Sequence, residues 1–162
     1  MKILYFSAFM FAMIALTNAL AKSDLVKRSA RCSPGWTPFN GRCFRYIPRP
    51  MSWAKAERNC VSMRGNLASV HDIEEYHEIQ RLIMTSSHEY KETWIGGTDA
   101  QEANQWFWSD GTRFLFTNWC SGEPNNTHGV QRCLQINYGY QKCWDDFECF
   151  FPKPSVCARK GY

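Results

Sequence analysis

Two short stretches of this chain carry the oxygen donors that hard metal ions prefer. The first, Glu123-Pro124-Asn125, supplies a carboxylate and a carboxamide, and the second, Asp145-Asp146, supplies two further carboxylates directly after a tryptophan. Calcium is coordinated by several such oxygens in proteins. If the two stretches meet in the fold, they could hold a calcium ion that has positions left open for the hydroxyl groups of a sugar. The alternative interpretation is a set of solvated loop charges, which are common on protein surfaces.

The sequence has none of the spacings that indicate common catalytic centres. Its four histidines lack the His-Glu-x-x-His spacing of zinc hydrolases. No Gly-x-Ser-x-Gly nucleophile motif is present. We therefore expect a binding protein and not an enzyme.

The N-terminus has the pattern of a secretory signal peptide. Lys2 precedes an apolar run over residues 3–16, and small residues follow up to Ala19. The run is shorter than the roughly 20 apolar residues that cross a bilayer. We predict a cleaved signal peptide over residues 1–19, a pro-segment over residues 20–28 ending at Lys27-Arg28, secretion to the extracellular space, and no membrane span.

The remaining part, residues 29–162, has the length of one domain. The whole chain has a formal net charge of +4, and the segment before residue 29 holds four of its basic residues and one acid, so the domain is close to neutral. Because no cluster of lysine or arginine is left in the sequence of the domain, we expect no nucleic acid partner.

The cysteines indicate a domain held together by disulfides. An even number of cysteines in a small exported domain favours internal pairing, and the absence of any Cys-x-x-Cys pair argues against zinc. Spacing alone does not decide the connectivity. If all are paired internally, any oligomer is noncovalent. The eight residues are Cys32, Cys43, Cys60, Cys120, Cys133, Cys143, Cys149 and Cys157.

Two helices are predicted in the first half of the domain. Ser52 can cap a helix that runs to about Met63. Asp72 begins a second helix, in which Glu75 completes a capping box. The inner face of this second helix is predicted, from its spacing, to be Ile73, Tyr76, Ile79 and Ile83.

Short strands are expected on either side of the helices. A hairpin is predicted over residues 32–46, and further strands at 67–70, 94–97, 106–108, 114–119, 133–136 and 155–158. Residues 85–91 are predicted to form a loop. The long irregular stretch between Trp119 and Cys133 has a length that usually indicates function.

A series of motifs occurs in order along the chain: Cys32-x-x-Gly35-Trp36, Trp53-x-x-Ala56-x-x-x-Cys60, Trp94-Ile95-Gly96-Gly97, Glu123-Pro124-Asn125, Trp144-Asp145-Asp146 and Val156-Cys157-Ala158. Taken together, these motifs resemble the C-type lectin domain, and particularly small secreted fish lectins and type II fish antifreeze proteins. The resemblance covers Cys32 to about Arg159. It implies an α+β fold with two helices, two small antiparallel sheets and a long ligand-binding loop, over residues 29–162.

The resemblance also implies a disulfide pattern. In the family, the matching cysteines form Cys32–Cys43, Cys60–Cys157 and Cys133–Cys149. Cys120 and Cys143 are left over, and a bridge between them resembles a feature of the antifreeze branch.

The calcium ligands implied by the resemblance come from the two stretches described first and from one residue between them. They are Glu123, Asn125, Gln131, Asp145 and Asp146, of which Glu123, Asn125 and Asp145 would contact the sugar. The Glu123–Pro124 bond is expected to be cis. Gln131 replaces a glutamate of the family and Asp145 replaces the usual asparagine, so three carboxylates are kept. An ionised Asp145 offers a sugar only acceptors, which weakens the expected sugar affinity.

A second, auxiliary calcium site of the family is expected to be lost. Asp99 matches its first acid, but Ala103, Asn126 and Gln131 stand at other ligand positions, and Arg132 repels a cation. We predict one bound Ca²⁺ and not two.

Three classes of function agree with these residues. The first is a calcium-dependent lectin of the kind used in innate defence, with mannose-type specificity from the Glu-Pro-Asn triplet, or galactose given Asp145. The second is an ice-binding protein, and the third is a domain that binds a protein partner. Asn125-Asn126-Thr127 is also an N-glycosylation acceptor sequence, which conflicts with a ligand role for Asn125, and we favour the ligand role.

Overall fold

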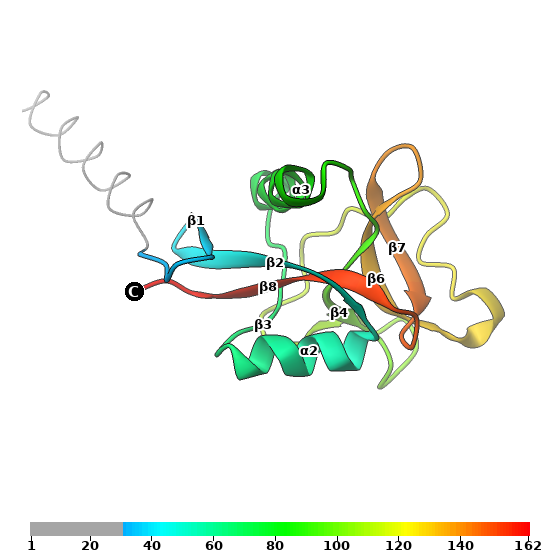
Figure 1. Cartoon of the computed structure of the whole chain (residues 1–162). Coiled ribbons are helices and arrows are strands. Elements are labelled where there is room, and N and C mark those ends of the chain that lie inside the picture. The colour runs from blue at the N-terminus through cyan, green and yellow to red at the C-terminus, as the bar shows by residue number, and fades with distance from the viewer. Residues whose placement is uncertain (1–30) are drawn as a thin grey trace, which may run out of the picture.

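The computed structural model describes residues 31–162, so the predicted signal peptide and pro-segment lie outside the described residues. Figure 1 shows a sheet with helix α2 on one side and helix α3 on the other. The C-terminus lies at one end of the sheet, and the long loop before β6 lies at the opposite end. Within residues 31–162, no helix has both the length and the apolar character needed to cross a membrane.

Eight strands form the sheet, in the order β1-β2-β8-β4-β6-β7, with β3 added to β8 and β5 added to β4. We expected two small sheets, and the structure joins them because Trp94 of β4 pairs in parallel with Ser155 of β8. The helices are α2 (Trp53–Ser62) and α3 (Ile73–Ser87), with a short 3-10 turn at Thr127–Gly129. The strands are β1 (Thr37–Phe39), β2 (Arg42–Met51), β3 (Asn66–Leu67), β4 (Thr93–Thr98), β5 (Phe107–Trp108), β6 (Gln131–Tyr138), β7 (Cys143–Glu148) and β8 (Lys153–Lys160).

The Asp72 N-cap predicted for α3 is confirmed, but the reciprocal bond of the capping box is shifted by one residue, to His71. Asp72 accepts a hydrogen bond from the Glu75 backbone N–H, and the Glu75 carboxylate accepts one from the His71 backbone N–H. Tyr76, Ile79 and Ile83 are buried as expected. Ile73, however, is 39% exposed, and the buried residue of the first turn is Glu75, because its carboxylate pairs with Arg42 of β2 at 2.6 Å.

Other elements differ from the prediction in detail. Ser52 stands at the start of α2, but its side chain makes no capping hydrogen bond. Helix α3 continues through Ser87, so the loop expected from residue 85 begins later. The strand predicted over 67–70 is confined to β3, and beyond it Ala68 makes one backbone hydrogen bond to Val156 and one to Gly96 without continuing the strand.

The stretch predicted as a strand at residues 114–119 has no strand pairing except one bridge between Trp119 and Trp144. Aromatic packing holds it in place instead. The ring centroid of Trp119 lies 4.8 Å from that of Trp106 and 5.7 Å from that of Trp144. These contacts anchor the chain immediately before the long loop, and Trp144 is fully buried immediately before Asp145.

All four expected disulfides are confirmed, namely Cys32–Cys43, Cys60–Cys157, Cys120–Cys143 and Cys133–Cys149. The Cys120–Cys143 bridge matters most for the site. It ties the start of the long loop to the first residue of β7, the strand that carries Asp145 and Asp146.

Candidate metal and ligand site

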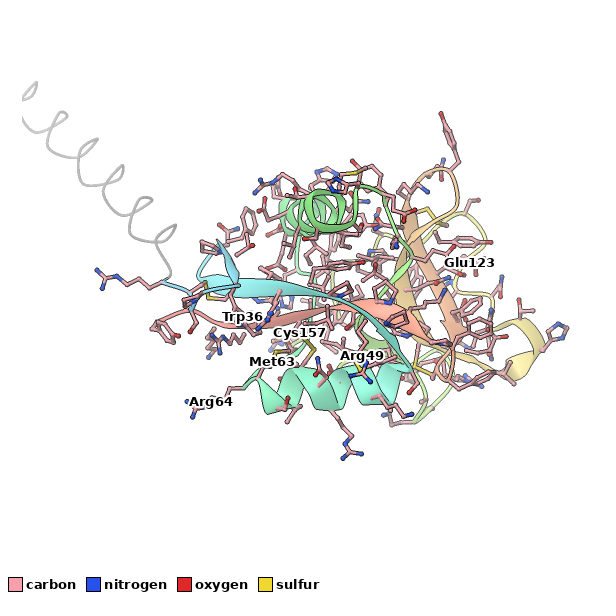
Figure 2. The ribbon with its side chains drawn as sticks, in the orientation of Figure 1. Trp36, Arg49, Met63, Arg64, Glu123 and Cys157 are labelled. Atoms are coloured by element: carbon pink, nitrogen blue, oxygen red, sulfur yellow. A yellow bond between two sulfur atoms is a disulfide. The ribbon has the colours of Figure 1, made fainter. Side chains whose placement is uncertain are left out.

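The structure brings the three predicted acids together. Glu123, from the long loop, and Asp145 and Asp146, from β7, each offer a carboxylate oxygen, and these oxygens lie within 4.8 Å of one another. Asp145 and Asp146 are buried, whereas Glu123 is half-buried. Figure 2 places Glu123 beside β7, at the end of the molecule away from the C-terminus. No other group of three histidine, cysteine or acidic side chains converges in this way within residues 31–162.

The backbone of the loop is fastened to Asp146. The N–H groups of Asn125 and Asn126 donate to its two carboxylate oxygens at 3.0 and 2.7 Å. The Glu123–Pro124 peptide bond is cis, as expected. Asn125 also donates from its Nδ2 to Glu123 Oε1 at 2.9 Å. These bonds hold the Glu-Pro-Asn triplet against β7, with the Glu123 carboxylate beside those of Asp145 and Asp146.

Gln131 and Asn125 lie on the same side of the loop, because both accept from one backbone donor. The N–H of Thr127 is 2.9 Å from Gln131 Oε1 and 2.9 Å from Asn125 Oδ1. Gln131 is buried, and its own N–H donates to Asn126 Oδ1 at 3.2 Å. Both side-chain amides therefore hydrogen-bond within the long loop. Their role as calcium ligands stays a prediction.

A further residue of the site, Gln135, was missed from the sequence. Gln135 lies on β6 opposite Asp145 and donates from its Nε2 to Asp145 Oδ2 at 2.6 Å. Its side chain is fully buried, and its neighbours in the sequence are the apolar residues Leu134 and Ile136. A glutamine inside an apolar strand is a sequence signal that could have indicated a buried polar partner.

The electrostatics of the site favour a cation. Burial, and then the negative charge of Asp145, raise the pKa of Glu123 from its ordinary value to about 7. Burial is also the main reason that the pKa of Asp145 is raised to about 6. A divalent cation between these carboxylates would stabilise their ionised forms and oppose both shifts.

The position of the auxiliary site is taken up by an ion pair. Arg132 Nη1 lies 3.2 Å from Asp99 Oδ2, and the same oxygen accepts a hydrogen bond from the Asn104 N–H at 2.7 Å. The guanidinium already balances the charge of Asp99. This arrangement supports the expectation of a single calcium ion.

Comparison with known proteins identifies the class. Residues 49–159 match the family model described as the lectin C-type domain, so the chain belongs to the C-type lectin domain family. It is 42% identical over 131 residues to ladderlectin of Oncorhynchus mykiss, covering 81% of this chain and 69% of that protein. It is 39% identical over 158 residues to the type-2 ice-structuring protein of Osmerus mordax, covering 91% and 87%. It is 34% identical over 155 residues to the galactose-specific lectin nattectin of Thalassophryne nattereri, covering 96% of each.

Solved structures of similar proteins confirm the fold. The herring type II antifreeze protein superimposes with a TM-score of 0.76 at 38% identity, and the match covers 81% of this chain and 100% of the herring chain. A calcium-independent type II antifreeze protein gives a TM-score of 0.75 at 35% identity, covering 83% and 98%. These relatives are lectins and antifreeze proteins and not enzymes. Because one of them is calcium-independent, calcium binding here has to be argued from the site itself.

Proposed function

We propose that this chain is a secreted, calcium-dependent carbohydrate-binding lectin. The observation that carries the proposal is the convergence of Glu123, Asp145 and Asp146. Within residues 31–162, no lysine, arginine or histidine forms an ion pair with any of these three acids. Three carboxylates this close repel one another, and a bound Ca²⁺ would neutralise them. The proposed ligands are Glu123, Asn125, Gln131, Asp145 and Asp146.

The sugar would bind through hydroxyl groups that share the calcium ion. Glu123 and Asp145 supply acceptors for these hydroxyls, and Asn125 supplies a donor from its Nδ2. We favour mannose-type sugars because of the Glu-Pro-Asn triplet. Galactose is the competing specificity, since Asp145 alters the set of donors and nattectin is named as galactose-specific. A single domain of this kind binds monosaccharides weakly, so a noncovalent oligomer would add avidity.

The test compares retention of the secreted protein on mannose–agarose and galactose–agarose in calcium, followed by elution with EDTA. We expect retention on mannose–agarose and loss of retention for Glu123→Ala. The matched control is Glu102→Ala, which removes an exposed acid outside the site. Millimolar calcium should also raise the melting temperature, because a ligand that binds only the folded state stabilises it. An unchanged melting temperature would contradict calcium binding.

Ice binding is the second candidate, and the similarity to the Osmerus mordax ice-structuring protein over 91% of the chain favours it. The Cys120–Cys143 bridge adds to this argument. Thermal hysteresis, measured with calcium and with EDTA, separates this candidate from the lectin. If the protein binds calcium but is retained on no glycan resin and shows no thermal hysteresis, a domain that binds a protein partner would be favoured instead.

A further inference from the structure

A second group of charged residues lies at the opposite end of the molecule from Glu123. An open pocket of about 460 Å³ is formed there by the start of β2, the chain after α2, β3 and the end of β8. Figure 2 shows Arg64 at this end and Glu123 at the other. The side chains of the pocket that can carry positive charge are Arg42, Arg64, His71, Arg159 and Lys160, and its only acid is Asp110.

Most of this positive charge has no counter-ion among residues 31–162. Arg42 is neutralised, because its Nη1 lies 2.6 Å from Glu75 and its Nη2 lies 3.9 Å from Asp110. Within residues 31–162, Arg64, Arg159 and Lys160 form no ion pair with any acid. The pocket therefore presents cationic groups that are free to neutralise an anion.

One of these cations is held in place by the fold. The Arg159 guanidinium lies 4.2 Å from the centroid of the Trp36 ring, and its Nη1 donates to the Met63 carbonyl at 3.1 Å. Its Nε is buried and has no hydrogen-bond partner. A guanidinium fixed in this way loses little conformational entropy when it binds a ligand.

Arg64 has an unusual backbone for its residue type. It follows α2 with φ of 61°, in the left-handed region where glycine is the usual choice. That conformation is unfavourable for a residue with a Cβ. Its side chain is exposed at the rim of the pocket, where a positive charge also complements the C-terminal end of α2.

Further unpaired cations lie along β2 and α2, outside the pocket. Arg45 and Arg49 of β2, and Lys55 and Arg58 of α2, are also exposed and form no ion pair among the described residues. The sequence predicted no basic cluster because these residues are dispersed along the chain. Of these, Arg49 and Lys55 lie toward the other end of β2 and α2, whereas the pairing of Arg42 with Lys160 and the packing of α2 against β8 bring the basic residues of the pocket together at one end.

The other residues of the pocket indicate the kind of anion. Asn66 and Thr112 offer neutral polar groups, and the only apolar side chain in the lining is Ala158. Guanidinium groups bind sulfate and phosphate with paired hydrogen bonds. Asn66 Nδ2 donates to Glu57 and the Thr112 hydroxyl donates to Asp110, so their oxygens are left as neutral acceptors for sugar hydroxyls. A pocket of about 460 Å³ lies in the range that accommodates small ligands.

We propose that this pocket binds an anionic saccharide through a sulfate or phosphate ester group, independently of the calcium site. A long nucleic acid is disfavoured, because the domain as a whole is close to neutral. The site would let one molecule contact neutral sugars at one end and charged sugars at the other.

The test measures binding of the secreted protein, in EDTA and at low salt, to a heparin tetrasaccharide and to a phosphorylated mannan fragment. The first probe carries sulfate esters and the second carries phosphate esters, so the two arms distinguish the sources of the anion. We expect binding to at least one probe, weakening as salt rises. The double variant Arg64→Gly/Lys160→Gln should bind about tenfold more weakly, because it removes two charged hydrogen-bonding groups.

Lys142→Gly is the matched control. Lys142 also has a left-handed backbone, with φ of 56°, and forms no ion pair, but it lies in the β6–β7 hairpin and not in the pocket. Glycine suits both positions, so neither change to glycine should prevent folding. The control should bind the probe as the unchanged protein does. The double variant should keep calcium-dependent retention on neutral sugar resin, so failure of this proposal is distinguishable from failure of the lectin proposal.

Several results would overturn the proposal. Absence of binding to both probes in EDTA would do so, as would equal weakening by Lys142→Gly. Equal binding of chemically desulfated heparin and of dephosphorylated mannan would show that the ester groups do not matter. Tighter binding of a DNA duplex than of either saccharide would assign the pocket to nucleic acid instead.

Discussion

The side-chain amide of Gln135 donates a hydrogen bond of 2.6 Å to Asp145, and both residues are buried where β6 pairs with β7. The bond holds Oδ2 of Asp145 toward the strand. The carboxylate is thereby oriented for the cation site by a residue that does not itself belong to the proposed ligand set.

Gln135→Ala should therefore weaken calcium binding. Partners that orient a metal ligand typically contribute about tenfold or more to metal affinity. Isothermal titration with calcium measures the effect. Gln80→Ala is the control, because Gln80 also donates two hydrogen bonds, to Asn137 and to the Lys142 carbonyl, but away from the site. Equal affinities of the Gln135 variant and the unchanged protein would contradict the positioning role.

The contribution of Glu123 and Asp145 to stability should fall with rising pH in EDTA and rise with pH in calcium. In EDTA, the pKa of Glu123 is raised in the folded state from 4.5 to about 7 and that of Asp145 from 3.8 to about 6. The folded state then binds more protons than the unfolded state in this range, so the contribution of these groups to stability falls as pH rises from about 4 to 7. Calcium binds the ionised carboxylates, so its stabilising effect should grow over the same range.

Thermal melts at a series of pH values, with EDTA and with calcium, check this prediction. The variant Glu123→Gln/Asp145→Asn should lose the fall in stability in EDTA that these two groups cause. It should also lose the calcium effect. A calcium effect that is larger at pH 5 than at pH 7.5 would be opposite to the expected sign.

Asp145→Asn should strengthen retention on mannose–agarose. An asparagine at this position could accept the hydrogen bond from Gln135 with its oxygen and present its NH₂ group to a sugar hydroxyl. An unpaired buried hydroxyl costs about 1–3 kcal/mol, so the gain should be measurable as slower elution by free mannose. Asp146→Asn is the contrasting change, because Asp146 accepts backbone N–H groups with both oxygens and should lose retention. Weaker mannose retention by the Asp145 variant would show that the carboxylate is needed for more than its acceptors.

Removing the Cys120–Cys143 bridge should loosen the loop that carries Glu123. The bridge closes a segment with a sequence separation of 23, which the chain-entropy model values at about 3 kcal/mol of stability. The double alanine variant should melt at a lower temperature and bind calcium more weakly. Removing Cys32–Cys43, which lies outside the site, should lower the melting temperature but leave calcium affinity unchanged. Equal calcium affinities of the two variants would show that the bridge does not support the site.

Asn125 should be unmodified in the secreted protein. Its Nδ2, the atom that a glycan would be attached to, donates to Glu123 at 2.9 Å inside the site. Mass spectrometry of the peptide containing Asn125, with and without enzymatic removal of N-glycans, should show the unmodified mass. A glycan on most molecules would make Asn125 unavailable as a calcium ligand and would contradict its proposed role.

The sequence by itself determined the family, the two helices and, through the resemblance, all four disulfides. It also pointed to the three acids that converge at the site. These features depend on local motifs, such as the Asp72 N-cap of α3 and the Glu-Pro-Asn triplet, whose chemistry can be recognised without knowing which residues lie nearby in space. The expected inner face of α3 was correct wherever helical spacing alone decides burial, at Tyr76, Ile79 and Ile83.

Only the tertiary structure decided which distant residues become partners. It joined the expected two sheets through Trp94 and Ser155, and it buried Glu75 in place of Ile73 because Arg42 supplies a counter-charge. It also placed Gln135 behind Asp145. The basic residues of the pocket, at the start of β2, after α2 and at the end of β8, are separated along the chain and meet only when those elements pack, because electrostatic interactions depend on distance in space and not on separation in sequence.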